Sequence, residues 1–421
     1  MPATPKSAWV GLDWSHSALA VVAVDRDGKK LLSFEVANDK PGFDQLLLRL
    51  SDFEVSGVAI ETRKGLIVQH LIEKGIPVYH VNPKVSKSWR NCYAVSPSKS
   101  DPLDAFALAD GLRIHKHWLE PITLDTDSLR LLRGYCEDEV SLIDEQTACV
   151  LKLKACLKSY FPVLLKWFGN WKSMSALEFL LLYSSPEKLA RASKSNLRAF
   201  LRRHRIGYTK PVWHERIENR GRDAWTGDAV TIEVKARRAI ALARQLVAIK
   251  KELRIYRSKI ESLFREHPDA PIFASLPGAG PKLAPRLLCM FGSDRTRYRS
   301  ASSLQRLSGV VPIQDTSGDG PARRRAGKQP RARFRWACRK ALRQTMHLFA
   351  HQAKRQSAWS RAYYDGARKS GQSMPQALRN LAAKWLKIIF RMWQTREPYD
   401  EERYVAALKR RSSPLAARLA A

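Results

Sequence analysis

The sequence has 421 residues, enough for two or three domains and at least one sizeable core. Lys and Arg total 74 against 40 Asp and Glu, a formal net charge of +34. The apolar run at 385–393 is interrupted by Lys387 and Arg391, which argues against a transmembrane span. No signal peptide is expected, because strand-like sequence with Asp13 follows the first few residues. The six cysteines form no Cys-x-x-Cys pair and indicate reduced thiols, as in a cytoplasmic protein.

The positive charge is concentrated toward the C-terminus. Residues 1–120 hold 15 basic and 14 acidic side chains, residues 121–270 hold 28 and 18, and residues 271–421 hold 31 and 8. A near-neutral first domain followed by increasingly cationic ones predicts that the second half binds a polyanion. Nucleic acid is the expected polyanion, with an anionic membrane surface as the rival.

The first 120 residues alternate between strand and helix patterns. The dipeptide Asp27-Gly28 is a hairpin turn signal between the second and third apolar runs. Three leading strands followed by alternating elements predict a mixed sheet with helices packed on it. The expected strands are 8–12, 18–25, 31–36, 57–60 and 77–81, and the expected helices are 42–50, 66–74 and 102–116.

The rest of the chain is predicted to be helical, so the fold class is α/β plus all-α. Residues 121–268 contain two long amphipathic helices, 127–161 and 229–266, which are typical of an antiparallel coiled-coil arm or an oligomerisation surface. Segment 165–228 between them, rich in aromatic residues and arginine, is interpreted as an inserted helical subdomain. Residues 269–421 form the third, basic domain, with expected helices at 336–354 and 375–394.

Four carboxylates stand out in the first domain. Asp13 and Glu61 each follow an apolar strand, while Asp101 and Asp104 share one face at the start of a helix. Catalysis by divalent ions needs carboxylates that converge from different elements, and Mg²⁺ prefers such oxygen ligands. Taken singly, each acid is better explained structurally, for example Asp101 before Pro102 as a helix cap. Taken together, the four predict a metal site.

A second candidate site lies in the basic domain. Ser317 occupies a glycine-flanked loop, Asp-Thr-Ser-Gly-Asp, and nearby cations could stabilise the transition state of its attack on a phosphate. A turn serine in a solvated loop is the plainer interpretation of that motif alone. The turn Leu276-Pro-Gly-Ala-Gly-Pro resembles a helix-hairpin-helix turn whose backbone approaches a DNA phosphate, or it is a plain interhelical turn. The candidate nucleic-acid-binding residues are Gly278, Gly280, Lys282, Arg323, Arg324, Arg325, Lys328, Arg331, Arg333 and Arg335.

Several motifs carry a specific resemblance. Those of the N-terminal half resemble the RuvC-like (RNase H-fold) domain of the bridge-RNA-guided transposases of bacterial insertion sequences: Gly11-Leu-Asp-Trp-Ser-His16, Ile60-Glu61-Thr, Val81-Asn-Pro83 and Lys99-Ser-Asp101-Pro-Leu-Asp104. Leu276-Pro-Gly-Ala-Gly, Gly309-Val-Val-Pro312 and Thr316-Ser317-Gly318 resemble the transposase domain of the same family. The chain departs from the family at Arg63-Lys64 and Trp14, and segment 165–228 has no counterpart.

The resemblance implies a function. The family's acidic set falls on Asp13, Glu61, Asp101 and Asp104, which would hold Mg²⁺, and its nucleophilic serine falls on Ser317. A DNA recombinase would then cut and rejoin donor and target DNA through a phosphoserine intermediate, guided by a structured noncoding RNA and acting as a homodimer or tetramer. Two alternatives remain: a metal-dependent, structure-selective nuclease without a covalent intermediate, and a non-enzymatic nucleic-acid-binding protein derived from a transposase.

Overall fold

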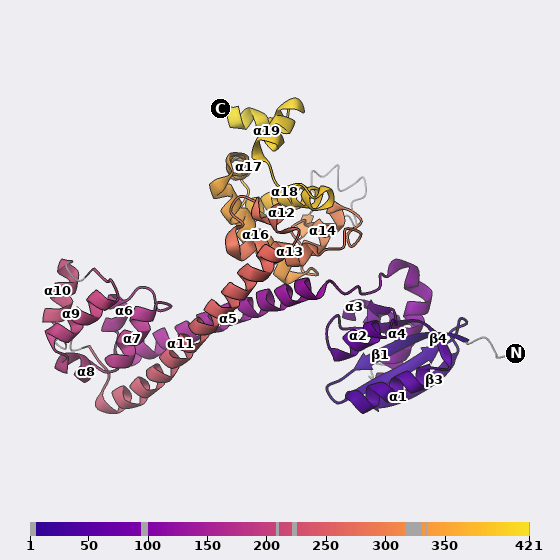
Figure 1. Ribbon diagram of the computed structural model, residues 1–421, viewed down its shortest axis with the longest axis horizontal. Coiled ribbons are helices and arrows are strands. Elements are labelled where there is room, and N and C mark those ends of the chain that lie inside the picture. The colour runs from indigo at the N-terminus through magenta and orange to yellow at the C-terminus, as the bar shows by residue number, and fades with distance from the viewer. Residues whose placement is uncertain are drawn as a thin grey trace. The chain divides into compact units, whose positions relative to one another are not determined.

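The chain divides into two compact units, Met1–Leu124 and Asp125–Ala421, in a computed structural model (Figure 1). The structure describes residues 6–93, 100–207, 210–220, 225–315, 331–333 and 335–420. The first unit holds a five-stranded sheet, and the second is built almost entirely of helices in its described part. This mixed α/β and helical architecture confirms the predicted fold class at that level.

The sheet of the first unit has the strand order β3-β2-β1-β4-β5. The pairs β1–β2 and β2–β3 are antiparallel. Strand β4 runs parallel to β1, and β5 runs parallel to β4. Gly28 supplies the positive φ of 84° in the β2–β3 turn that Asp27-Gly28 predicted. The strands are β1 (Lys6–Trp14), β2 (Ala18–Val24), β3 (Lys30–Ala37), β4 (Phe53–Ile60) and β5 (Val78–His80).

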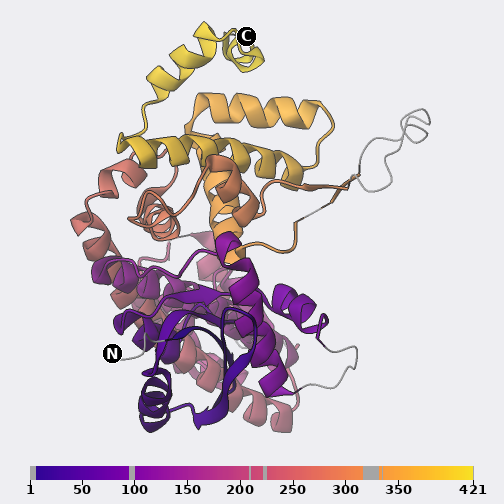
Figure 2. The ribbon, with the colours of Figure 1, turned by 90° about the vertical axis from the view of Figure 1, so that its right-hand side faces the viewer.

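Helices cover both faces of this sheet. The core on one face joins alternate residues of β1 and β4, such as Leu12 and Ile60, to α1 (Lys40–Leu50) and α2 (Leu66–Glu73). On the other face α4 (Asp101–His115) packs against β1 and β2 through small residues, among them Ala105 and Ala109 (Figure 2). The close approach requires Gly11, where a Cβ would come within 2.0 Å of the Ala105 carbonyl oxygen.

One helix of this unit was not predicted. Helix α3 (Pro83–Arg90) begins where the sequence indicated only the end of a strand at Asn82-Pro83. The Asn82 side chain caps it by accepting a hydrogen bond of 2.9 Å from the Lys84 amide, and Pro83 suits the first turn because it needs no amide hydrogen there. A 3-10 turn, η1 (Lys116–Trp118), follows α4.

The second unit is built around two long helices, α5 (Asp127–Tyr160) and α11 (Ala229–Glu266), at the predicted positions. Their contacts show an antiparallel pair: the Cys156 thiol lies 3.3 Å from the Lys235 carbonyl oxygen, while Glu139, earlier in α5, meets Arg257, later in α11. Cys149 and Cys156, seven residues apart, are both buried on the side of α5 that faces α11.

Five short helices form a module with its own apolar core at one end of this pair (Figure 1). Trp171, Phe179 and Phe200 are buried in it, and the Gly227 amide donates to the Tyr160 carbonyl where the chain returns to α11. The aromatic residues of segment 165–228 therefore contribute largely to packing. The helices are α6 (Val163–Trp167), α7 (Met174–Leu182), α8 (Pro186–Arg191), α9 (Lys194–Arg203) and α10 (Pro211–Glu218).

The C-terminal helices share the largest apolar core among the described residues with the other end of the α5–α11 pair. Trp359, Trp385 and Trp393 are fully buried there, and α16, α17 and α18 pack against one another (Figure 2). The helices are α12 (Ala270–Ala274), α13 (Gly280–Phe291), α14 (Ala301–Ser308), α16 (Lys340–Gln356), α17 (Ala358–Lys369), α18 (Met374–Thr395), α19 (Glu401–Arg410) and α20 (Pro414–Ala420). Among the helices in the described ranges, none has the length and apolarity needed to cross a membrane.

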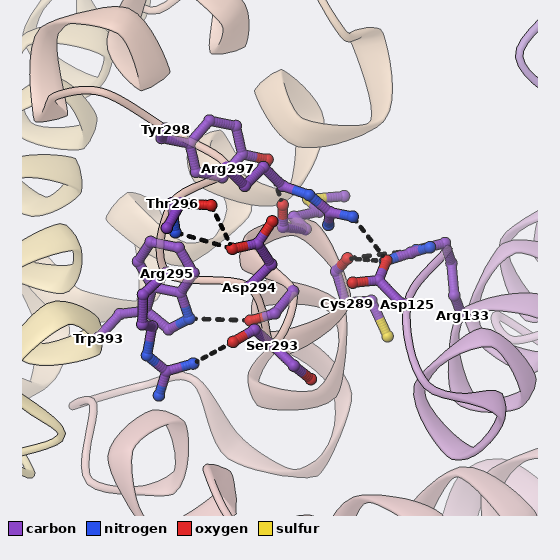
Figure 3. A network of polar contacts seen from close by, with 12 residues as sticks. Asp125, Arg133, Cys289, Ser293, Asp294, Arg295, Thr296, Arg297, Tyr298 and Trp393 are labelled. Carbon is purple, nitrogen blue, oxygen red and sulfur yellow. Dashed lines mark hydrogen bonds and ion pairs between the residues drawn. The ribbon is translucent and has the colours of Figure 1, made fainter. Parts of the chain in front are cut away.

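A polar network ties the start of α5 to the loop after α13 (Figure 3). Asp125, with 2% of its side chain exposed, is bonded by Arg133 at 2.5 Å and by Arg297 at 2.9 Å. Burial opposes ionisation of this carboxyl, but the hydrogen bonds and charges of the two arginines outweigh burial and lower its pKa. Arg133 also donates to the Cys289 carbonyl, and the Trp393 indole donates to the Gly292 carbonyl. The network therefore has a structural role.

Candidate metal and nucleic-acid sites

Two of the four predicted acids meet at one edge of the sheet. Strands β1 and β4 are parallel neighbours, with Leu12 opposite Ile60, so Asp13 and Glu61 follow at the same level. Residues alternate between faces along a strand, and Leu12 and Ile60 belong to the core on the α1–α2 side. Asp13 and Glu61 therefore lie on the opposite face, the one that α4 covers.

The position of α4 brings the other two acids to the same edge. Its C-terminal part lies beside the β2–β3 turn, where Arg113 donates to the Arg26 carbonyl at 3.1 Å. Ala105, near its start, lies against Gly11, so the N-terminus of α4 points to the edge where β1 and β4 end. Asp101 is the exposed first residue of the helix, and Asp104 lies one turn later. The topology thus places all four acids on one face of the sheet, at one edge.

Two of these carboxylates are held by α3, a feature that the sequence did not indicate. The Ser86 hydroxyl donates a hydrogen bond to Glu61 Oε1, and Arg90 Nη1 lies 3.2 Å from Asp104 Oδ1 and 3.4 Å from Oδ2. The Arg90 and Asp104 side chains are only 14% and 23% exposed. Residues Ser86 and Arg90 are four apart in a helix, which places them on one face. A helix start at Asn82-Pro83 followed by two polar residues four apart is the sequence pattern from which this contact face could have been predicted.

The described residues hold no group of three or more His, Cys, Asp and Glu side chains close enough to bind a metal ion. The predicted metal site is therefore a set of four acids that share an edge and a face without being gathered around one point. Their chemistry fits Mg²⁺, since all the donors are hard carboxylate oxygens, contributed by the ends of β1 and β4 and by the start of α4. Contacts to Arg90 and Ser86 occupy Asp104 and Glu61.

The loop with the candidate nucleophile falls largely outside the described residues, and so do Ser317, Arg323, Arg324, Arg325 and Lys328. Strands β6 (Ile313–Asp315) and β7 (Arg331–Arg333) pair antiparallel on either side of it, with Asp315 opposite Arg331. Arg331 and Arg333 thus lie on the strand that follows the serine. Their roles, like that of Ser317, stay predictions.

The glycine turn before α13 is explained partly by packing. Gly278 has a φ of +80°, and a Cβ there would come within 2.8 Å of the Gln352 backbone in α16. That side of the turn faces another helix. A Cβ at Gly280, in contrast, would meet no packed neighbour within 4 Å among the described residues, and Lys282 is exposed at the start of α13. Gly280 and Lys282 are therefore the members of this turn that are accessible to a phosphate.

The C-terminal helices carry further cations that the sequence did not single out. A cavity of about 910 Å³ borders α17 and α20. It is lined by one acid, Asp365, and by four basic side chains, Arg355, Arg361, Lys369 and Arg418.

His347 of α16 has a buried Nε2 that has no hydrogen-bond partner among the described residues. Burial lowers its pKa, and the charges of Arg379 and Arg343 lower it further.

Two family models match this chain. A model of DEDD-type IS110 transposases matches residues 10–162, which include all four acids. A model of the IS116/IS110/IS902 transposase family matches residues 270–365. The chain belongs to the IS110 family of insertion-sequence transposases.

Relatives of the transposase are similar over nearly their whole length. A mini-circle transposase for IS117 from Streptomyces coelicolor is 28% identical over 96% of this chain and 97% of its own length. The 42 kDa protein of insertion element IS900 from Mycobacterium paratuberculosis is 27% identical over 95% and 98%. The IS116 protein of Streptomyces clavuligerus is 27% identical over 91% and 94%. Transposition of DNA is thus the activity of the family, and its DEDD domain indicates the use of a divalent metal.

Proposed function

We propose that this transposase cuts and rejoins donor and target DNA through a phosphoserine intermediate. Asp13, Glu61, Asp101 and Asp104 would bind Mg²⁺ in an RNase H-like domain. Ser317 would attack a DNA phosphodiester, displacing a 3′- or 5′-hydroxyl end and conserving the energy of the phosphodiester bond in the phosphoserine link. Rejoining then needs no ATP, because a strand hydroxyl displaces the serine.

The observation that supports this proposal is the shared edge and face of the sheet at which the four acids lie. Two parallel strand ends and one helix N-terminus bring hard oxygen ligands to one edge and one face of the sheet. Bound there, Mg²⁺ would supply charge stabilisation at phosphate oxygens. Surface cations of the second unit would hold the nucleic-acid backbone, consistent with 31 basic and 8 acidic residues in 271–421.

Further parts of the proposal follow from the resemblance in the sequence. A structured noncoding RNA from the element would pair with donor and target DNA, so that the protein reads backbone and shape while the RNA reads sequence. Two or four copies would assemble, and the acids of one protomer would complete the serine site of another.

The test is a search for a covalent protein–DNA adduct. The transposase is co-expressed with the flanking RNA of its element, shown to bind that RNA, supplied with donor and target DNA and Mg²⁺, and run on denaturing gels. We expect an adduct that maps to Ser317 and is lost in Ser317→Ala and in Asp13→Ala. Mixing the two variants should restore the adduct if the acids act on the serine of another protomer. Cleavage that survives Ser317→Ala but not Asp13→Ala would replace the proposal by a nuclease without a covalent intermediate.

A further inference from the structure

Helix α3 presents two polar side chains to the four-acid edge from a single face. Ser86 is buried, with 6% of its surface exposed, and donates to Glu61. Arg90, one turn later, contacts both oxygens of Asp104 through one nitrogen. One short helix thus contacts two of the four acids, and each of those acids comes from a different element.

Contacts of Trp89 hold α3 in this position. The Trp89 ring lies against Gly111 of α4, where a Cβ would come within 2.1 Å of the ring. It also stacks on His115, with ring centroids 5.3 Å apart and planes 13° apart. Because Trp89 is held between the backbone and a second ring, the neighbouring Arg90 is directed at Asp104 rather than into solvent.

A guanidinium and a divalent ion compete for the same carboxylate. The guanidinium of arginine is a cation, and that of Arg90 lies beside Asp104. The partial burial of this pair keeps water from screening the charge fully. A divalent ion that uses Asp104 must therefore displace Arg90 or bind beside a like charge. The serine, in contrast, is neutral and fixes Glu61 without opposing a cation.

We infer that Arg90 is an internal cation that a divalent metal must displace from Asp104, and that Ser86 is a positioning residue that holds Glu61 for the same metal. This inference rests on the proposed metal role of the four acids. The displacement makes metal occupancy depend on a side-chain movement of α3. Metal affinity in the free protein is then kept low by the chain itself.

Metal binding, measured without any DNA or RNA, tests the inference. Manganese(II) chloride is titrated into the full-length protein, and free Mn²⁺ is followed by electron paramagnetic resonance. We expect Arg90→Gln to bind roughly tenfold more tightly than the wild type, since it removes the competing charge but keeps a polar side chain. Arg90→Lys keeps the charge and should bind within about twofold of the wild type. Ser86→Ala should bind several-fold more weakly.

Asp13→Asn separates the two possible failures. If Asp13→Asn abolishes Mn²⁺ binding while Arg90→Gln binds no more tightly than the wild type, the acids bind metal and the displacement is wrong. If Asp13→Asn leaves the binding unchanged, the metal role of the acids fails, and the inference fails with it. Thermal unfolding of the metal-free variants is measured as well. If Arg90 had only a structural role, Arg90→Gln would lower the unfolding midpoint without changing the Mn²⁺ affinity. Should Arg90→Gln not fold, equal affinities of Ser86→Ala and the wild type would overturn the role of Ser86.

Discussion

Glu139 offers a strong test of how the second unit is held together. It lies in α5 with 3% of its side chain exposed, and it binds Arg257 of α11 at 2.9 Å and Arg286 of α13 at 2.8 Å. Burial alone would raise its pKa, but the hydrogen bonds and charges of the two arginines lower it below the ordinary value. One carboxylate therefore joins three helices.

The change Glu139→Gln should lower the free energy of unfolding by about 2–4 kcal/mol. Removing one partner of a buried ion pair costs about 3–5 kcal/mol, because it leaves a buried charge uncompensated. Here Arg286 is 11% exposed and loses that compensation, whereas Arg257 is 45% exposed and is screened by water. Only Arg286 is thus left as a buried, uncompensated charge, so the expected loss is smaller than that of a fully buried pair.

Urea unfolding of the full-length protein, followed by circular dichroism, measures this loss. Arg257→Gln is the matched control, since it removes the exposed partner and should cost less than about 1 kcal/mol. A Glu139→Gln loss no larger than that of the control would refute the reasoning that burial decides the cost.

The same carboxylate should contribute to acid unfolding. A group whose pKa is lower in the folded state stabilises the protein above its unfolded pKa, here about 4.5, and this stability is lost as the pH falls through the folded pKa. Between about pH 5 and pH 3 the wild type should therefore lose more stability than Glu139→Gln. Parallel curves for the two proteins in that range would contradict a lowered pKa.

Two further changes test other parts of the molecule. Gly111→Ala should destabilise the first unit by about 1–3 kcal/mol and displace α3, because its Cβ would overlap the Trp89 ring; an unchanged tryptophan fluorescence and unfolding midpoint would show that the ring moves freely. Replacing Arg361, Lys369 and Arg418 by Gln should weaken DNA binding equally for all sequences and reduce the salt dependence of log K by about one per lost phosphate contact, as measured by fluorescence anisotropy. An unchanged salt slope would place the DNA elsewhere.

Much of the first unit follows from its sequence. The apolar runs before Asp13 and Glu61 are buried strands, and the period of two in those strands assigns both acids to the same face. The structure is needed to tell which face of the sheet α4 covers, because this depends on the contact between Gly11 and Ala105. That contact joins residues more than ninety positions apart, and no local pattern encodes it.

Helix α3 shows a different limit of sequence reasoning. Its eight residues include two lysines, two serines and an arginine, so no apolar periodicity marks it. Its contact face depends on Trp89, which fits only because α4 has Gly111 at the facing position. Ser86 and Arg90 were therefore missed as neighbours of the acids. The stripe of α5 was predicted better, since apolar residues and cysteines repeat along it.

The length of α5 fixes a spacing between two cores of the second unit. Leu132 is buried in the C-terminal core and Leu157 in the core of the α6–α10 module, 25 positions apart in one continuous helix. At about 1.5 Å per residue this is about 37 Å, close to one helical turn of B-DNA at about 34–36 Å. A duplex lying along the helix pair would therefore present the same groove to the surfaces of the two groups of helices that enclose these cores.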